Sequence, residues 1–79
     1  MKINVEELVR YLARSLVQEP DQVNVTTVDS DRSVVIELRV APGDMGRVIG
    51  KQGRIAKAIR TVVKSATANE KKKYTVEIL

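Results

Sequence analysis

The hydrophobic residues of this chain recur with two different periods, and the change from one period to the other predicts six secondary-structure elements. Near the start, apolar residues return every three or four positions, which is the spacing of one face of an amphipathic helix. They are Val5, Leu8, Val9, Leu12, Ala13, Leu16 and Val17. Asn4 and Glu7 fit the start of this helix as an N-cap and its reciprocal acidic partner, and Pro20-Asp21 ends it.

Three other stretches alternate apolar and polar residues with a period of two, and each predicts a half-buried strand. The first is short and surrounds residues 23–25, the second and clearest spans residues 33–40, and the third spans residues 74–78. Their apolar members are Val23, Val25, Val34, Ile36, Leu38, Val40, Tyr74, Val76 and Ile78. Residues 29–32 form a turn between the first two strands, because Asp and Ser side chains bond to nearby backbone.

Two glycines interrupt a helical pattern in the second half of the chain. A short helix is predicted over residues 43–49, and a longer one follows, with Ile55, Ile59, Val62, Val63 and Ala66 as its inner stripe. Glycine costs about 1 kcal/mol relative to alanine in a helix interior, so Gly50 and Gly53 indicate that one helix stops and another begins. We expect Gly50 to take the left-handed conformation that ends a helix, and Gly53 to let a backbone or ligand come close.

The start of that second helix predicts an anion site. Its free amide groups should point out of the turn beside Lys51 and Arg54, which suits a phosphate. A Gly-x-x-Gly sequence alone is also compatible with a plain helix-turn-helix connection. The functional interpretation is favoured by the long polar pair Lys51-Gln52 and by the basic residues around it.

The order helix-strand-strand-helix-helix-strand constrains the topology. The first two strands are joined by a few residues and should pair antiparallel, whereas about thirty residues separate the second and third, enough for a right-handed crossover that makes them parallel. We therefore predict one α+β two-layer (α/β) domain over residues 1–79, with a mixed three-stranded sheet packed on three helices. The other sheet face should be wet, with Asn24, Thr26, Glu37, Arg39, Thr75 and Glu77.

Composition and charge narrow the function classes. The 79 residues contain no cysteine and no apolar run near the ~20 residues of a membrane span, so we expect a cytoplasmic protein without a membrane partner. Residues 1–42 hold five basic and seven acidic side chains, and residues 43–79 hold nine basic and three acidic ones. Such polarised charge is expected of a polyanion binder, although a solvated basic face explains it equally well.

The sequence contains no obvious candidates for catalytic residues. The chain has no His and no Cys, so we predict no catalytic residue, no cofactor and no small-molecule substrate. Asp29 and Asp31 give two metal ligands at best, and turn chemistry explains them, so no metal site is expected. Tyr11 and Tyr74 are the two aromatic residues and are expected in core or edge packing, and Lys71-Lys72-Lys73 is interpreted as a solvated loop in preference to an RNA attractor.

Val48-Ile49-Gly50-Lys51-Gln52-Gly53, placed between the two middle helices, resembles the turn of a type II KH domain, a module that binds single-stranded nucleic acid. The resemblance covers essentially the whole chain. Asp44-Met45-Gly46-Arg47 before the turn, Ile59-Arg60-Thr61-Val62-Val63 after it and the small size are similar to the bacterial KhpA family. One departure is Ala56, where many KH sequences have a large aliphatic residue; here Ile55 stands one position earlier.

The resemblance implies roles for particular residues. In KH domains the Gly-x-x-Gly loop clamps about four nucleotides. Gly50 and Gly53 would then allow close backbone approach, and Lys51 and Gln52 would contact phosphate or sugar. Flanking residues are expected to add electrostatic contacts (Arg47, Arg54 and Lys57) or an apolar groove wall (Val48, Ile49 and Ile55), and core packing is the alternative for the last three.

The KhpA resemblance also implies a physiological setting. It implies an RNA chaperone or post-transcriptional regulator that forms homodimers, or heterodimers with a larger KH protein of the KhpB or Jag type, with consequences for cell shape and cell wall growth. The alternative is a protein-interaction module with little RNA affinity, whose dimer interface would use Met45, Val48 and the outer rim of residues 54–64.

Overall fold

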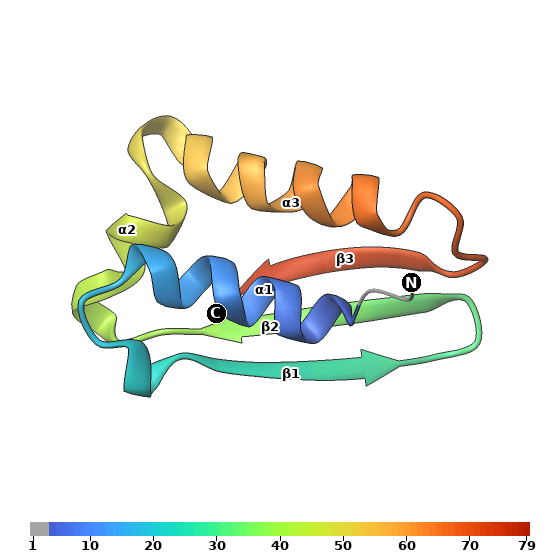
Figure 1. Cartoon of the computed structure of the whole chain (residues 1–79), viewed down its shortest axis with the longest axis horizontal. Helices are drawn as coiled ribbons and strands as arrows, with labels where there is room; N and C mark the ends of the chain where they lie inside the picture. Colours follow the sequence, from blue (N-terminus) through green and yellow to red (C-terminus); the bar gives the residue numbers. More distant parts are fainter. Residues whose placement is uncertain (1–3) are drawn as a thin grey trace.

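The computed structural model describes residues 4–79 as a three-stranded sheet covered on one face by helices (Figure 1). The longer elements are α1 (Val5–Leu16), β1 (Asn24–Asp29), β2 (Ser33–Arg39), α2 (Met45–Ile49), α3 (Arg54–Ala66) and β3 (Lys73–Ile78). Short 3-10 turns join them at η1 (Pro20–Gln22), η2 (Pro42–Asp44) and η3 (Lys51–Gly53). The predicted order of helices and strands is confirmed.

The sheet has β2 at its centre and β1 and β3 at its two edges. β1 runs antiparallel to β2, with Asn24 opposite Arg39, and β3 runs parallel to β2, with Lys73 opposite Ser33. Both orientations follow from the connections, because a tight turn joins β1 to β2 and a two-helix crossover joins β2 to β3. The mixed sheet is as predicted.

The core lies between the sheet and the helices, where the apolar faces predicted by periodicity meet. Its buried members are Val5, Val9, Ala13, Val23, Val25, Val34, Ile36, Leu38, Ile59, Val63 and Val76. On the opposite sheet face, Asn24, Thr26, Arg39, Thr75 and Glu77 are exposed and Glu37 is half-buried. The prediction of one wet face is therefore confirmed.

Two residues predicted to pack in the core or at its edge are exposed. Val62 is 41% exposed and Tyr11 is 71% exposed. Val62 borders a groove between α1 and α3. Tyr11 lies on the outer side of α1, so the core or edge packing predicted for Tyr11 is wrong. Tyr74 does pack half-buried against the core.

The starts of the first two helices differ in detail from prediction. Asn4 Oδ1 accepts a hydrogen bond from the amide of Glu7 at 3.2 Å, which confirms the N-cap. The carboxylate of Glu7 pairs with Arg10, so an ion pair replaces the reciprocal half of the predicted capping box. The second helix begins at Met45 instead of residue 43, because Pro42–Asp44 form the 3-10 turn η2.

Candidate nucleic-acid interface

The turn between α2 and α3 contains three residues with positive φ. Gly50 has φ 77° and ψ 171°, Gln52 has φ 58° and ψ 25°, and Gly53 has φ 74° and ψ 15°. The prediction that Gly50 takes the left-handed helical conformation is wrong, since its ψ is extended and that combination is essentially restricted to glycine. The left-handed helical conformation instead occurs at Gln52 and Gly53.

The two glycines serve different purposes. A Cβ added at Gly50 would overlap Cγ1 of Ile55 and would lie 2.9 Å from the backbone nitrogen of the same residue. The missing side chain at Gly50 therefore lets α3 begin close against the end of α2. A Cβ added at Gly53 would meet nothing within 4 Å in the described part of the chain. Gly53 thus leaves space on the outside of the turn, where the backbone of a ligand can come near.

The turn uses some of its own amides. Gly50 donates to the carbonyl of Gly46 at 2.9 Å, Gly53 donates to the carbonyl of Gly50 at 3.1 Å, and Arg54 donates to the carbonyl of Lys51. The first amide of α3 is therefore occupied, which corrects the expectation that all of its first amides point outward. Within residues 4–79 no side chain caps α3, so the positive end of its dipole faces the turn.

The predicted polar contact residues share one surface. Lys51 and Gln52 are exposed at the tip of the turn, and Arg54 and Lys57 are exposed in the first turn of α3. The structure therefore brings these four together around the space beside Gly53.

The three apolar residues predicted as a groove wall separate from one another. Val48 is fully buried, so core packing is its role. Ile55 is half-buried and packs on the core, next to Gly50. Ile49 is 36% exposed at the end of α2, and of the three it faces solvent most. Ala56 is buried, so its small side chain belongs to the packing beneath α3.

A buried carboxylate fixes the position of α2 and the turn. Asp44 is 2% exposed and accepts hydrogen bonds from the amides of Gln18 and Glu19, each at 3.0 Å. Its Oδ1 also lies 3.2 Å from Nε of Arg47, so this predicted RNA contact is partly engaged inside the protein. Asp44 joins the segment after α1 to the start of α2. This role of Asp44 was not predicted, although an Asp ahead of a short helix with an Arg three positions later was an available signal.

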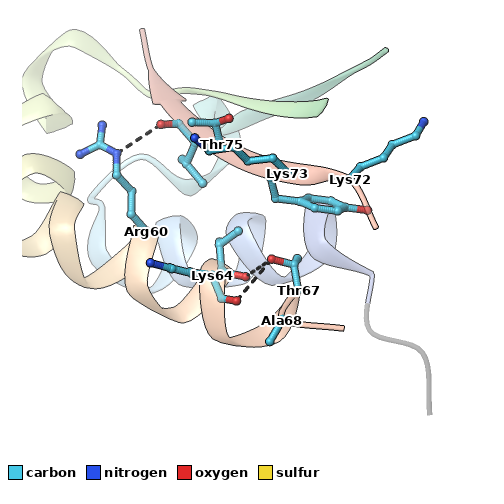
Figure 2. A pocket seen from close by; sticks show the side chains of 10 residues that line it. Arg60, Lys64, Thr67, Ala68, Lys72, Lys73 and Thr75 are labelled. Carbon is cyan, nitrogen blue, oxygen red and sulfur yellow. Dashed lines mark hydrogen bonds between the residues drawn. The ribbon is translucent and has the colours of Figure 1, made fainter. Parts of the chain in front are cut away.

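A groove lies between α3 and β3. It has a volume of about 330 Å³. Figure 2 shows Arg60 and Lys64 on α3, and Lys72, Lys73 and Thr75 on the segment of β3, with the side chain of Lys72 extending away from α3. The lining residues are Arg60, Val63, Lys64, Thr67, Ala68, Lys72, Lys73, Tyr74, Thr75 and Val76.

The cations of α3 connect the turn with this groove. Lys57, Arg60 and Lys64 are exposed and recur at i, i+3 and i+7, so they share one side of the helix. The groove was not predictable from periodicity, because its two walls come from segments that are distant along the chain.

The open edge of β3 forms one wall of the groove. Nε of Arg60 donates to the carbonyl of Val76 at 3.3 Å (Figure 2). The amides of Lys73 and Leu79 donate toward the β2 side, so the backbone groups of alternate residues such as Tyr74 and Val76 face away from the sheet. The groove therefore offers backbone donors and acceptors beside its cationic rim.

The described part of the chain meets the requirements of neither a metal site nor a membrane-spanning helix. Residues 4–79 contain no group of three His, Cys, Asp or Glu side chains that could hold a metal ion. In the same range, every helix is too short or too polar to cross a membrane.

Comparison with known proteins identifies the family. A family model described as "KhpA/KhpB, KH domain" matches residues 6–78. The RNA-binding protein KhpA of Clostridium perfringens (strain 13 / Type A) is 57% identical over 75 residues, covering 95% of this chain and 100% of that protein. The RNA-binding protein KhpA of Caldanaerobacter subterraneus subsp. tengcongensis is 58% identical over 73 residues, covering 92% and 97%.

Solved structures show the same fold at low identity. Aquifex aeolicus Era bound to GDP.AlF4- matches with a TM-score of 0.65 and 22% identity, over 95% of this chain and 30% of Era. Era in complex with MgGDPNP and nucleotides 1506–1542 of 16S ribosomal RNA matches with a TM-score of 0.59, at the same identity and coverage. The architecture is a type II KH fold, and the chain belongs to the KhpA/KhpB family of KH domains.

Proposed function

We propose that this protein holds a short stretch of single-stranded RNA, about four nucleotides long, across the turn and the groove between α3 and β3. The observation that carries the proposal is the exposed Lys51-Gln52 pair. From this pair, the exposed cations of α3 lead to a groove with a cationic rim. The names of the KhpA relatives as RNA-binding proteins support the same ligand.

In this proposal the turn positions the sugar-phosphate backbone. Gly53 leaves room for it, Lys51 and Gln52 contact phosphate or sugar, and Arg54 and Lys57 add attraction beside the positive end of α3. Arg47 has a smaller part than the sequence suggested, because Asp44 already holds its Nε.

The groove receives the bases. Its floor includes the buried side chains of Val63 and Val76, and its far wall is the backbone of β3. Because the cations act on phosphate and few side chains can read base edges, the site should bind readily and discriminate modestly between sequences. Ile49 is the apolar residue of α2 that remains available to a base.

The test replaces Lys51 and Gln52 together by Asp. Binding of a fluorescent single-stranded RNA should be lost, and the wild type should weaken with salt with a log–log slope of about −0.7 for each phosphate contacted. The matched control, Arg39→Asp with Gln22→Asp, makes the same change in net charge at exposed positions away from the groove and should keep most of the affinity. Equal RNA binding by the turn variant would refute the assignment.

A second function, self-association, is favoured by a different surface. A groove of about 230 Å³ between α1 and α3 is lined by Leu12, Ser15, Leu16, Ile55, Ala58, Ile59 and Val62. Except for Ser15 its lining is apolar, and an exposed apolar surface of this kind is typical of a protein interface. The proposed occupant is the same surface of a second copy.

A partner of the KhpB or Jag type is the heteromeric version of this proposal. Support comes from one family model that describes KH domains of both KhpA and KhpB, so such a partner would carry a related helical face. The RNA-chaperone or regulatory role in the cytoplasm, and the link to cell shape and cell wall growth, rest on family resemblance. Light scattering on the same samples used for RNA binding separates the two functions. If the protein were only an interaction module, replacing Lys51 and Gln52 by Asp would change the dimer mass, and the wild type would have little RNA affinity to lose.

A further inference from the structure

We propose that the free edge of β1 binds an extended, basic segment of a partner polypeptide as a fourth strand of the sheet. β1 forms the edge of the sheet opposite β3 (Figure 1). The proposed partner strand would therefore lie at the opposite edge of the sheet from the groove between α3 and β3, and the two sites meet only at one end, where Lys72 pairs with Asp29.

The backbone of β1 offers a row of outward-facing groups. The amide of Ser30 donates to the carbonyl of Ser33, and this pair continues the antiparallel register in which Asn24 lies opposite Arg39. Even-numbered residues of β1 therefore bond to β2, whereas the N–H and C=O groups of Val25, Thr27 and Asp29 point away from the sheet. An added strand can pair with these groups.

The two edges of the sheet differ in how they are protected. At β3, the Nε of Arg60 donates to the carbonyl of Val76, and two lysines precede a strand that itself begins with Lys73. Residues 24–29 contain no Lys, Arg or Pro, which are the residues that commonly protect an edge strand. Thr26, Thr27 and Val28 are exposed and favour β structure, so the edge of β1 suits strand addition.

Charge selects a basic partner. Between Arg14 and Arg32 the sequence has four acidic residues and no basic one; they are Glu19, Asp21, Asp29 and Asp31. All four are exposed, and they bracket β1 at both ends. Lys72 pairs with Asp29 at 2.6 Å and offsets its charge, so the other three carboxylates supply the negative charge around β1. Lys or Arg side chains at the ends of an added strand would meet these carboxylates, whereas nucleic acid would be repelled.

A hollow beside β1 can receive one of those basic side chains. It measures about 360 Å³ and lies over the inner face of the sheet, where Thr27 and Asp29 of β1 line it together with the start of α1, Val34 and Ile36 of β2, and Tyr74 of β3. Three carboxylate side chains contribute to its lining, those of Glu6, Asp29 and Glu70. Alternate side chains of an added strand face this side of the sheet, which places a Lys or Arg near them.

The same charges disfavour a second copy as the occupant. Two β1 strands related by a two-fold axis would run antiparallel. Glu19 and Asp21 of one copy would then lie near Asp29 and Asp31 of the other, and like charges across neighbouring strands are destabilising.

The test uses an eight-residue labelled peptide in which Lys alternates with Val and Thr, and a twin with Glu in place of Lys. We expect saturable binding of the Lys peptide below about 1 mM and none of the Glu peptide. Thr27→Pro removes an outward-facing N–H without removing a bond to β2, and should weaken binding at least about tenfold. The control Thr27→Ala keeps the N–H and should bind within about twofold of wild type.

A second measurement on the wild type does not depend on how the proline variant folds. Amide NMR signals of Val25, Thr27 and Asp29 should shift with the Lys peptide, and the amide of Thr27 should exchange more slowly with solvent. Absence of binding, shifts confined to the turn and β3, or equal affinity for both peptides would overturn the proposal. So would concentration-dependent dimers that Thr27→Pro abolishes, because they would make a second copy the occupant.

Discussion

Replacing each glycine of the turn region by alanine should give three different effects on stability. At Gly50, a φ of 77° with a ψ of 171° costs an L-residue about 1–3 kcal/mol. The new Cβ would also lie 2.9 Å from the backbone nitrogen of Ile55, a residue of α3 that cannot move alone. Overpacking of this kind costs typically about 1–3 kcal/mol. The smaller conformational freedom of the unfolded alanine chain returns about 0.4–1 kcal/mol, so Gly50→Ala should lose about 3 kcal/mol.

The other two glycines serve as internal controls. Gly53 has a left-handed helical conformation with open space around it, so Gly53→Ala should lower the free energy of unfolding only through the strain of that conformation. This strain is about 1–2 kcal/mol, before the gain from the smaller conformational freedom of the unfolded alanine chain. Gly46 lies within α2, and a Cβ there meets nothing within 4 Å of the described chain. Gly46→Ala should therefore stabilise the protein by about 0.5–1 kcal/mol.

Urea unfolding followed by circular dichroism measures these differences, and thermal unfolding checks them. For a domain of this size each kcal/mol corresponds to about 4–8 °C, so Gly50→Ala should lower the melting temperature by about 12–24 °C. The ranking matters more than the absolute values. If Gly50→Ala and Gly53→Ala were equally stable, the packing of Gly50 against Ile55 would not be the reason for glycine at that position.

Two further predictions concern α2 and the helical face. Asp44→Asn should destabilise the fold by about 2–4 kcal/mol in urea unfolding, because only one of the amides of Gln18 and Glu19 would keep an acceptor oxygen and the other would face an NH2 group. The exposed control Asp31→Asn should change stability by less than about 0.5 kcal/mol. Val62→Glu should shift the protein to monomer in sedimentation velocity and leave RNA affinity unchanged, with Thr61→Glu as the exposed neighbouring control; dimers that persist in Val62→Glu would exclude the α1/α3 groove as the interface.

The fold was predictable because its periodic patterns are strong and its connections leave few choices. In β2, Val34, Ile36 and Leu38 alternate with less buried residues, and this pattern cannot be mistaken for a helix. The turn was also predictable, because two glycines three apart do not fit inside a helix. What the sequence did not distinguish was the kind of strain at each glycine, since that depends on how α3 packs back on Gly50.

The features that sequence analysis missed join residues that are distant along the chain. The groove depends on Arg60 of α3 meeting Val76 of β3, and Asp44 binds amides more than twenty residues earlier. Periodicity also identifies the apolar side of a helix without identifying what covers it. Val62 fits the inner stripe of α3, yet α1 leaves it exposed, and that misprediction marks the surface proposed for self-association.

The two edge strands give the sheet an electrostatic direction that explains how both proposed partners can bind together. The edge at β3 has the cations of α3 and residues 71–73, and the edge at β1 has four carboxylates nearby. The edges are separated by two strand spacings, about 10 Å, which exceeds the Debye length of about 8 Å at physiological ionic strength. RNA at one edge should therefore act only weakly on a basic segment at the other edge in the cell. At low salt the same charges act over the whole sheet, and a polyanion at β3 should then draw the basic segment away from β1. Competition between the two ligands that is seen only in dilute buffer would therefore reflect long-range charge and not a shared site.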